Sequence, residues 1–251
     1  MAADKIEIIP LPGIPIVEEG NNIAGLILQS LEKIPMKLVT GDILVIAHTL
    51  ISKAEGRVIT GSEVEVSQKA TEIAEANDFD AIQVEIALQE SKNVIRSSRA
   101  LITELENGHI CNFSGVDRSN APEGKFVLLP KDADKSAYRI MEELGEETNQ
   151  EIAVIISDTE GRPWRKGAIN IAVGCAGINA FKYNKGRKDL YDRILQHSLV
   201  CQIDQVASAA EMIMGQANEG LPVVIVRGYE YESGEENAKS VYRSTEENLF
   251  K

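Results

Sequence analysis

The sequence is poor in cysteine, in aromatic residues and in positive charge. Its 251 residues include three cysteines, three histidines and 5% aromatic residues, and 26 Lys plus Arg stand against 39 Asp plus Glu, a formal net charge of −13. Cys111, Cys175 and Cys201 are far apart and form no CxxC pair, which excludes a disulfide framework and a structural zinc site of ordinary spacing. The acidity argues against nucleic acid and anionic membranes as partners, because both need a clustered basic face.

Long apolar runs are also lacking. No segment approaches the roughly 20 apolar residues that a bilayer span needs, and prolines interrupt MAADKIEIIPLPGIP where a signal peptide would be continuously apolar. We therefore expect a soluble, reduced, cytoplasmic protein. Hydrophobic residues at 43% and charged residues at 26% are typical of a globular chain with a mainly aliphatic core.

Short apolar segments alternate with helical stripes along the whole chain. Strands are predicted at 5–11, 41–50, 99–105, 126–130, 151–158, 167–178 and 221–228. Helices are predicted at 21–34, 66–95 with a break near 77–80, 132–145, 196–215 and the charged C-terminus. This mixture predicts an α+β (mixed α/β) fold, and the lack of a linker predicts one domain over 1–251. There is no P-loop, Rossmann fingerprint or GxSxG elbow, so any nucleotide must be held by an unfamiliar set of loops.

The segment ISDTEGRPWRKG at 156–167 is the first candidate site. Asp158 and Thr159 are expected at the carboxyl end of an apolar strand, where open α/β sheets generally bind ligands. Oxygen donors of this kind suit Mg²⁺, and three cations that suit phosphate follow: Arg162, Arg165 and Lys166. The alternative is that Asp158 is an ordinary turn residue.

Three further segments carry candidate residues. In SGVDRSN, Asp117 follows Gly115, which permits close approach of a ligand, although an Asx turn or helix cap is an equal alternative. In HTLISKAEGR, Lys53 is expected on a loop after a strand and suits phosphate, while His48 is either a ligand or a buried core histidine. In MGQANEGLP, backbone amides could bind an anion, or the segment is a plain helix-to-strand connection with a C-capping glycine.

Six segments in order, PLPGIPIV, GDILVIAHTLISKAEGR, SGVDRSNAPEG, ISDTEGRPWRKGAINIAVGCAGI, GRKDLYDR and EMIMGQANEGLPVVIVRG, resemble the coenzyme F420-0:γ-glutamyl ligase family. They cover nearly the whole chain, and they resemble the archaeal, stand-alone type. The resemblance implies a single domain with an unusual fold of two intertwined subdomains and mixed sheets. It also implies a GTP-dependent ligase that adds L-glutamate to F420-0 and then adds a second glutamate through a γ-linkage.

The resemblance further implies a homodimer, two divalent cations (Mg²⁺ or Mn²⁺) beside the nucleotide phosphates, and a monovalent cation, K⁺. The implied metal ligands are Asp117, Asp158, Thr159 and Gln216. The implied nucleotide contacts are Gly13, Ile14, Pro15, Ile16, His48, Thr49, Lys53, Asn120, Gly215, Gln216, Ala217, Asn218, Glu219, Gly220, Leu221 and Pro222. Position 48, where a small polar residue is expected, holds histidine, and the neutral Gln216 is a weaker ligand than the aspartates.

The expected mechanism is phosphorylation of a carboxylate by GTP, followed by attack of the glutamate amine. Lys53 and one of Arg162, Arg165 or Lys166 would neutralise the migrating phosphoryl group. Two other classes fit the same residues: a metal-dependent phosphohydrolase or phosphotransferase, and a GTP-binding regulatory protein. The lack of a P-loop argues against the regulatory protein.

Overall fold

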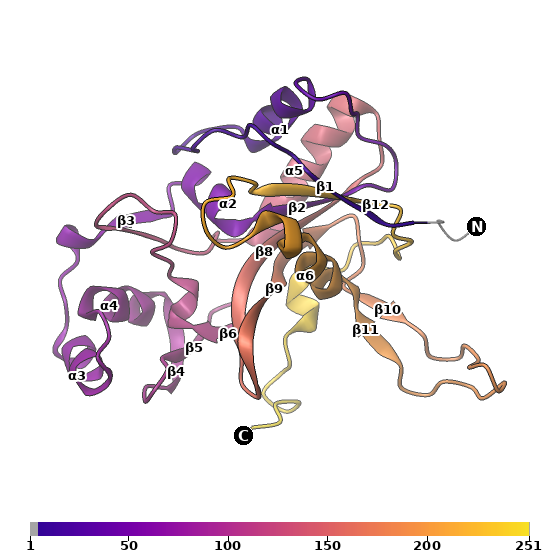
Figure 1. Cartoon of the computed structure of the whole chain (residues 1–251). Helices are drawn as coiled ribbons and strands as arrows, with labels where there is room; N and C mark the ends of the chain where they lie inside the picture. The colour runs from indigo at the N-terminus through magenta and orange to yellow at the C-terminus, as the bar shows by residue number, and fades with distance from the viewer. Residues whose placement is uncertain (1–4, 251) are drawn as a thin grey trace.

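The computed structural model describes residues 5–250, and its centre is a mixed five-stranded sheet in the order β1-β12-β2-β8-β9 (Figure 1). The strands are β1 (Glu7–Pro10), β2 (Ile43–Ala47), β8 (Ala153–Arg162), β9 (Arg165–Ala176) and β12 (Val223–Arg227). β2 runs parallel to β8, and the other neighbours are antiparallel. The α+β class predicted from the sequence is confirmed.

Helices cover both faces of this sheet, which explains why β2, β12 and the first half of β8 are almost wholly apolar. They are α1 (Ile23–Leu31) and α5 (Ala133–Thr148) on one face and α6 (Gln202–Met214) on the other. Side chains alternate along each strand, so Leu44 and Ile46 pack towards α1 and α5 while Ile43 and Val45 pack towards α6. Both helices on the first face are capped: Asn22 accepts from the amide of Gly25 in α1, and Asp132 accepts from the amide of Lys135 in α5.

Residues 58–128 form a second unit, the lobe, which lies on the left in Figure 1. Its elements are β3 (Val58–Thr60), η1 (Gly61–Glu63), α3 (Gln68–Asn77), α4 (Ala81–Glu90), β4 (Ser91–Arg96), β5 (Ile102–Leu105), β6 (Ile110–Asn112), η2 (Phe113–Gly115) and β7 (Lys125–Val127). β4, β5 and β6 form one small sheet, and β3 pairs with β7. The lobe has an aliphatic core of its own, built around α3 and α4.

A long hairpin, the arm, projects from the body of the molecule (Figure 1). It is formed by β10 (Phe181–Tyr183), β11 (Leu199–Cys201) and the connection between them. The C-terminal segment ends beside β9 and contains η3 (Ala238–Val241). Within residues 5–250, no helix is long and apolar enough to cross a bilayer.

The structure corrects several predicted elements, among them the start of the predicted helix at 196–215, where residues 199–201 form β11. The polar segment after β2, predicted as a loop, is a helix, α2 (His48–Ala54). Leu50 and Ile51 give this helix a buried face, which is hard to recognise in the sequence because polar residues surround them. Residues 91–96 are a strand rather than helix, since pairing with β5 overrides the helical pattern. β8 continues beyond Asp158 to Arg162 by pairing with β9, and the only helical turn in the described C-terminal segment is η3.

Candidate functional site

A cavity of about 370 Å³ lies between the central sheet and the lobe. Its walls come from β8, the first turn of α2, residues 111–120 of the lobe and the end of α6. Eight residues predicted from the sequence line it: His48, Thr49, Asp117, Asn120, Asp158, Thr159, Gly215 and Gln216. The fold therefore brings both predicted metal-binding aspartates to one cavity, one from the sheet and one from the lobe.

His48 and Asp158 form a buried pair at the base of this cavity. Ala47, the last residue of β2, pairs with Ser157 of β8. His48 follows Ala47 directly, which sets His48 Nε2 3.1 Å from Asp158 Oδ1. Burial opposes charge on both groups, but their attraction outweighs it, so the pKa of His48 lies above its ordinary value and the pKa of Asp158 below. His48 therefore meets both alternatives: it is a buried histidine, and its side chain contacts Asp158, a predicted metal ligand.

Asp117 is positioned by an unusual turn in the lobe. Phe113, Ser114 and Gly115 have φ values of 48°, 54° and 67°, three successive left-handed residues. Buried hydrogen bonds fix this turn, because the Ser114 hydroxyl donates to the carbonyl of Ala87 at 2.6 Å. The carboxylate of Asp117 accepts from the amide and hydroxyl of Ser119 at 2.7 and 2.6 Å, so the predicted Asx turn is present in a residue that also lines the cavity.

On the α6 side, Thr159 and Gln216 meet as predicted. Thr159 Oγ1 lies 3.0 Å from Gln216 Oε1 and 2.7 Å from Asn170 Oδ1. Gly215 ends α6 with a φ of 70°, as the C-cap alternative expected, and a side chain there would collide with Glu219. This geometry turns Gln216 back towards β8.

Lys53 lies just outside the cavity lining, in the last turn of α2. Its ammonium group donates to the carbonyl of Asn120 at 2.5 Å and connects α2 to the Asp117 loop. Burial lowers the pKa of Lys53, and the nearby charge of Asp117 partly opposes that shift. Lys53 is therefore a cation held beside the cavity on the side of Asp117.

The sequence analysis missed Glu160 and Asn170, which line the cavity together with Ser157. Glu160 is two residues after Asp158, and this period of two along a strand was the signal that could have found it. Burial, with the charges of Asp158 and Asp204, raises the pKa of Glu160 to about 8. His48 Nδ1 and the Ser157 hydroxyl are buried without a hydrogen-bond partner, which in a polar cavity points to a ligand or water as their partner.

The chemistry of the donors suits hard divalent cations. Mg²⁺ and Mn²⁺ prefer oxygen ligands. The cavity offers the carboxylates of Asp117 and Asp158, the hydroxyl of Thr159 and the amide oxygen of Gln216. His48 Nδ1 and the Ser157 hydroxyl, the cavity atoms without a partner, fit the same interpretation, because water bound to a metal ion would hydrogen-bond to them.

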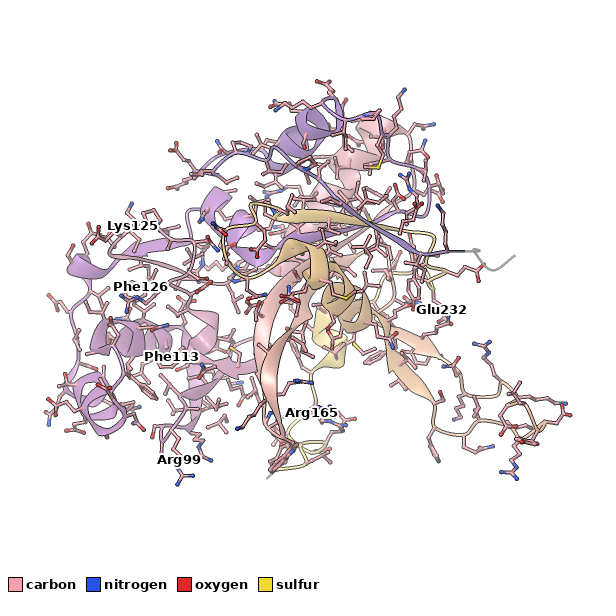
Figure 2. The ribbon with its side chains drawn as sticks, in the orientation of Figure 1. Arg99, Phe113, Lys125, Phe126, Arg165 and Glu232 are labelled. Atoms are coloured by element: carbon pink, nitrogen blue, oxygen red, sulfur yellow. The ribbon has the colours of Figure 1, made fainter. Side chains whose placement is uncertain are left out.

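Other predicted residues lie elsewhere. Because β8 extends to Arg162, the predicted cations Arg162, Arg165 and Lys166 lie at the tip of the β8–β9 hairpin and not in the lining of the cavity (Figure 2). The strand carries Arg162 roughly 13 Å beyond Asp158. The guanidinium of Arg162 donates to the carbonyls of Lys166 and Gly167, and Trp164 beside it is 77% exposed.

The remaining predicted contacts, Gly13–Ile16 and Ala217–Pro222, are not among the residues that line the cavity. The amide of Leu11 donates to the carbonyl of Val223, and the amide of Ala47 donates to the carbonyl of Pro222. Both segments therefore adjoin the sheet edge from which His48 enters the cavity.

The sequence profile of the family described as F420-0:Gamma-glutamyl ligase matches residues 13–228. Proteins named coenzyme F420:L-glutamate ligase are similar over most of their length. The one from Methanothermobacter thermautotrophicus is 44% identical over 89% of both chains, and those from Methanocaldococcus jannaschii and Methanopyrus kandleri are 41% and 40% identical over at least 97% of both chains. With this match and the convergence of its motif residues on one cavity, the chain belongs to the F420-0:gamma-glutamyl ligase family.

Proposed function

We propose that this protein is a GTP-dependent ligase that joins L-glutamate to coenzyme F420-0, and then joins the amine of a second glutamate to the γ-carboxylate of the first. The observation that carries the proposal is the convergence of Asp117 and Asp158 on one polar cavity, in a chain that belongs to this family. The relatives named above are called coenzyme F420:L-glutamate ligase, which gives the acceptor and the amino acid.

Amide formation from a carboxylate and an amine needs activation, because a carboxylate oxygen is a poor leaving group. In the proposed reaction, a carboxylate oxygen of F420-0 attacks the γ-phosphorus of GTP, which releases GDP and gives an acyl phosphate. The neutral amine of glutamate then attacks the acyl carbon, inorganic phosphate leaves with the bonding electrons, and the amine loses a proton. The protein contributes positioning and charge neutralisation rather than a covalent intermediate of its own.

Asp117, Asp158, Thr159 and Gln216 would hold two divalent cations, Mg²⁺ or Mn²⁺. When bound, such ions neutralise the charge on phosphate oxygens during phosphoryl transfer. His48 would orient Asp158 through the 3.1 Å contact between them, as a hydrogen-bonded partner orients many metal ligands.

Lys53 is the proposed cation for the migrating phosphoryl group, since it is half-buried beside Asp117. Thr49, Asn120, Gly13–Ile16 and the 215–222 turn would hold the rest of the nucleotide. Gly13 has a positive φ of 81° and nothing within 4 Å of its Cβ position, which leaves the backbone of that segment open to close approach of a ligand.

Two features support the homodimer that the family resemblance implies. The arm is basic in an otherwise acidic chain and carries exposed apolar residues, with Leu190 fully exposed and Tyr191 82% exposed. An acidic cavity of about 1300 Å³ lies between α5 and residues 229–239. In a dimer, the basic arm of one copy would have a charge opposite to that of the acidic cavity of the other. Size-exclusion chromatography with light scattering tests this; a single-subunit mass would refute the dimer.

The function is tested by incubation with F420-0, L-glutamate, GTP, Mn²⁺ and K⁺, with mass spectrometry of the deazaflavin product. We expect one and then two added glutamyl units, loss of product when GTP is replaced by ATP, and slower turnover when K⁺ is replaced by tetramethylammonium. Release of GDP should require both F420-0 and glutamate. GDP release without either substrate would instead indicate a phosphohydrolase, and GTP binding without any turnover would indicate a regulatory protein.

A further inference from the structure

A second group of polar side chains lies where the lobe meets β8. His109 precedes β6, Cys111 lies within β6 and Glu160 lies on β8. One ligand atom from each, an imidazole nitrogen, the thiol sulfur and a carboxylate oxygen, lies within 4.8 Å of the other two. The sequence spacing of cysteine and histidine excluded an ordinary zinc site, but the fold supplies the third ligand from a distant strand.

Two polar atoms of this cluster are buried and lack a hydrogen-bond partner. His109 and Cys111 are 3% and 4% exposed, and the side chain of Glu160 is 20% exposed. His109 Nε2 and Glu160 Oε1 face each other at 3.5 Å, yet neither makes a hydrogen bond. Two buried polar atoms that face each other without a hydrogen bond are unusual, and an ion bound by both atoms would satisfy them.

The separation of these atoms suits a metal ion. Ligand atoms about 2.1 Å from a tetrahedral ion lie about 3.4 Å apart, close to the 3.5 Å between His109 Nε2 and Glu160 Oε1. Imidazole, thiolate and carboxylate together favour a borderline ion such as Zn²⁺ over Mg²⁺, which prefers oxygen alone. Burial raises the pKa of the Cys111 thiol, and a bound cation would displace the thiol proton to solvent.

The surroundings hold these ligands in place. His109 and Cys111 are two residues apart in extended backbone and so share a face of the small sheet. The amide of Leu105 donates to the carbonyl of His109 at 2.8 Å, and the ring of Tyr242 lies 5.0 Å from the His109 ring. The cluster therefore joins the lobe, β8 and the C-terminal segment.

We propose that His109, Cys111 and Glu160 bind a divalent ion of the Zn²⁺ class, separately from the oxygen-donor site of Asp117 and Asp158. Three protein ligands leave one coordination position open, as in catalytic zinc sites. Cys111 and Glu160 also line the cavity, so that open position faces the space where substrates would bind. The ion would fasten the lobe to the central sheet and offer a fourth position to water or a substrate oxygen.

The test uses the full chain, freed of metal by a chelator, reduced, and titrated with Co²⁺ under anaerobic conditions. We expect a near-ultraviolet thiolate-to-cobalt absorption band that saturates at one equivalent and is bleached by Zn²⁺. The all-oxygen site of Asp117 and Asp158 gives no such band. Cys111→Ser should abolish the band, while Cys201→Ser, which alters a cysteine outside the cluster, should keep it.

His109→Gln and Glu160→Gln should keep the band but weaken Co²⁺ binding about 100-fold or more. Loss of a residue that only hydrogen-bonds to a metal ligand already lowers metal affinity about 10–100-fold. Circular dichroism of each metal-free variant checks folding, and these two variants keep the test decisive if Cys111→Ser does not fold. No band in the wild-type protein, a band that survives Cys111→Ser, or unchanged affinity in both Gln variants would overturn the proposal. None of these measurements depends on ligase activity, so the site and the proposed function stand or fall separately.

Discussion

Asp158 and Asp117 reach the same cavity from two regions that hold them in different ways. Asp158 lies in regular β structure, in register with Ile171 of β9 and beside the end of β2. Asp117 follows three successive left-handed residues in an irregular segment of the lobe. The sheet side is therefore held by many cooperative backbone hydrogen bonds, whereas the lobe side is held by a few specific ones. Changes remote from the chemistry should disturb the lobe side more.

The largest effect is expected from removal of either carboxylate. Asp158→Asn and Asp117→Asn should each lower kcat/KM by about 10²–10³-fold, since loss of a metal-ligating charge costs several kcal/mol of transition-state stabilisation. Steady-state glutamate ligation measures this, with the exposed Glu65→Gln of the lobe as control. Near-normal turnover of a folded Asp158→Asn protein would refute its role as a metal ligand.

A smaller loss should follow removal of the cation next to Asp117. Lys53→Met keeps the aliphatic stem but removes the ammonium group that bonds the carbonyl of Asn120, so we expect kcat to fall about 10²-fold. Lys69→Met, at an exposed position of α3, is the matched control. Equal rates for the two variants would exclude Lys53 from the reaction.

The lobe side can also be displaced through its backbone. Gly115→Ala places a Cβ in a left-handed residue, 2.6 Å from the Leu129 side chain, and should lower the free energy of unfolding by about 1–3 kcal/mol. Gly124→Ala has a similar φ, 71° against 67°, with nothing within 4 Å, and so carries the backbone penalty alone. Only Gly115→Ala should also weaken Mn²⁺ binding, measured by calorimetry. Identical metal affinity in both variants would show that the turn does not position Asp117.

The sheet side should respond to pH through its buried ion pair. The pKa of His48 is raised above 6.5, so its stabilising contribution is complete below pH 6.5 and is lost as the pH rises through the folded-state value. The pKa of Asp158 is lowered below 3.8, so its contribution is present above pH 3.8 and is lost on acidification. Urea unfolding in chelator should therefore show an alkaline decline that His48→Gln removes and His197→Gln, at an exposed position, keeps. The same decline in His48→Gln would contradict the pairing.

The smallest effect is expected at the tip of the β8–β9 hairpin. Arg165→Gln should change kcat/KM less than about 3-fold, because the hairpin carries this residue away from the cavity. A loss of about 10²-fold in kcat/KM would instead support the sequence-based prediction that Arg165 takes part in the reaction. It would mean that the hairpin tip contributes to the site of a second subunit.

The sequence predicted some regions of the molecule better than others, and the reasons are physical. The strand at 151–158 was evident because its apolar run is buried on both faces, and the two aspartates were found because loop carboxylates beside glycine or threonine carry a local signal. The length of β8 was not predictable, since pairing with β9 rather than local propensity extends it past polar residues. The cluster of His109, Cys111 and Glu160 was missed for a different reason. Contact between β6 and β8 unites residues that are far apart in the chain.

The central claim is that Asp117 and Asp158 jointly hold divalent cations. The most direct test is an anomalous difference map at the manganese absorption edge from a crystal grown with Mn²⁺ and GTP. The account predicts peaks within coordination distance of both carboxylates, with phosphate oxygens completing the shells. A map with bound nucleotide but no peak between the two side chains would contradict it.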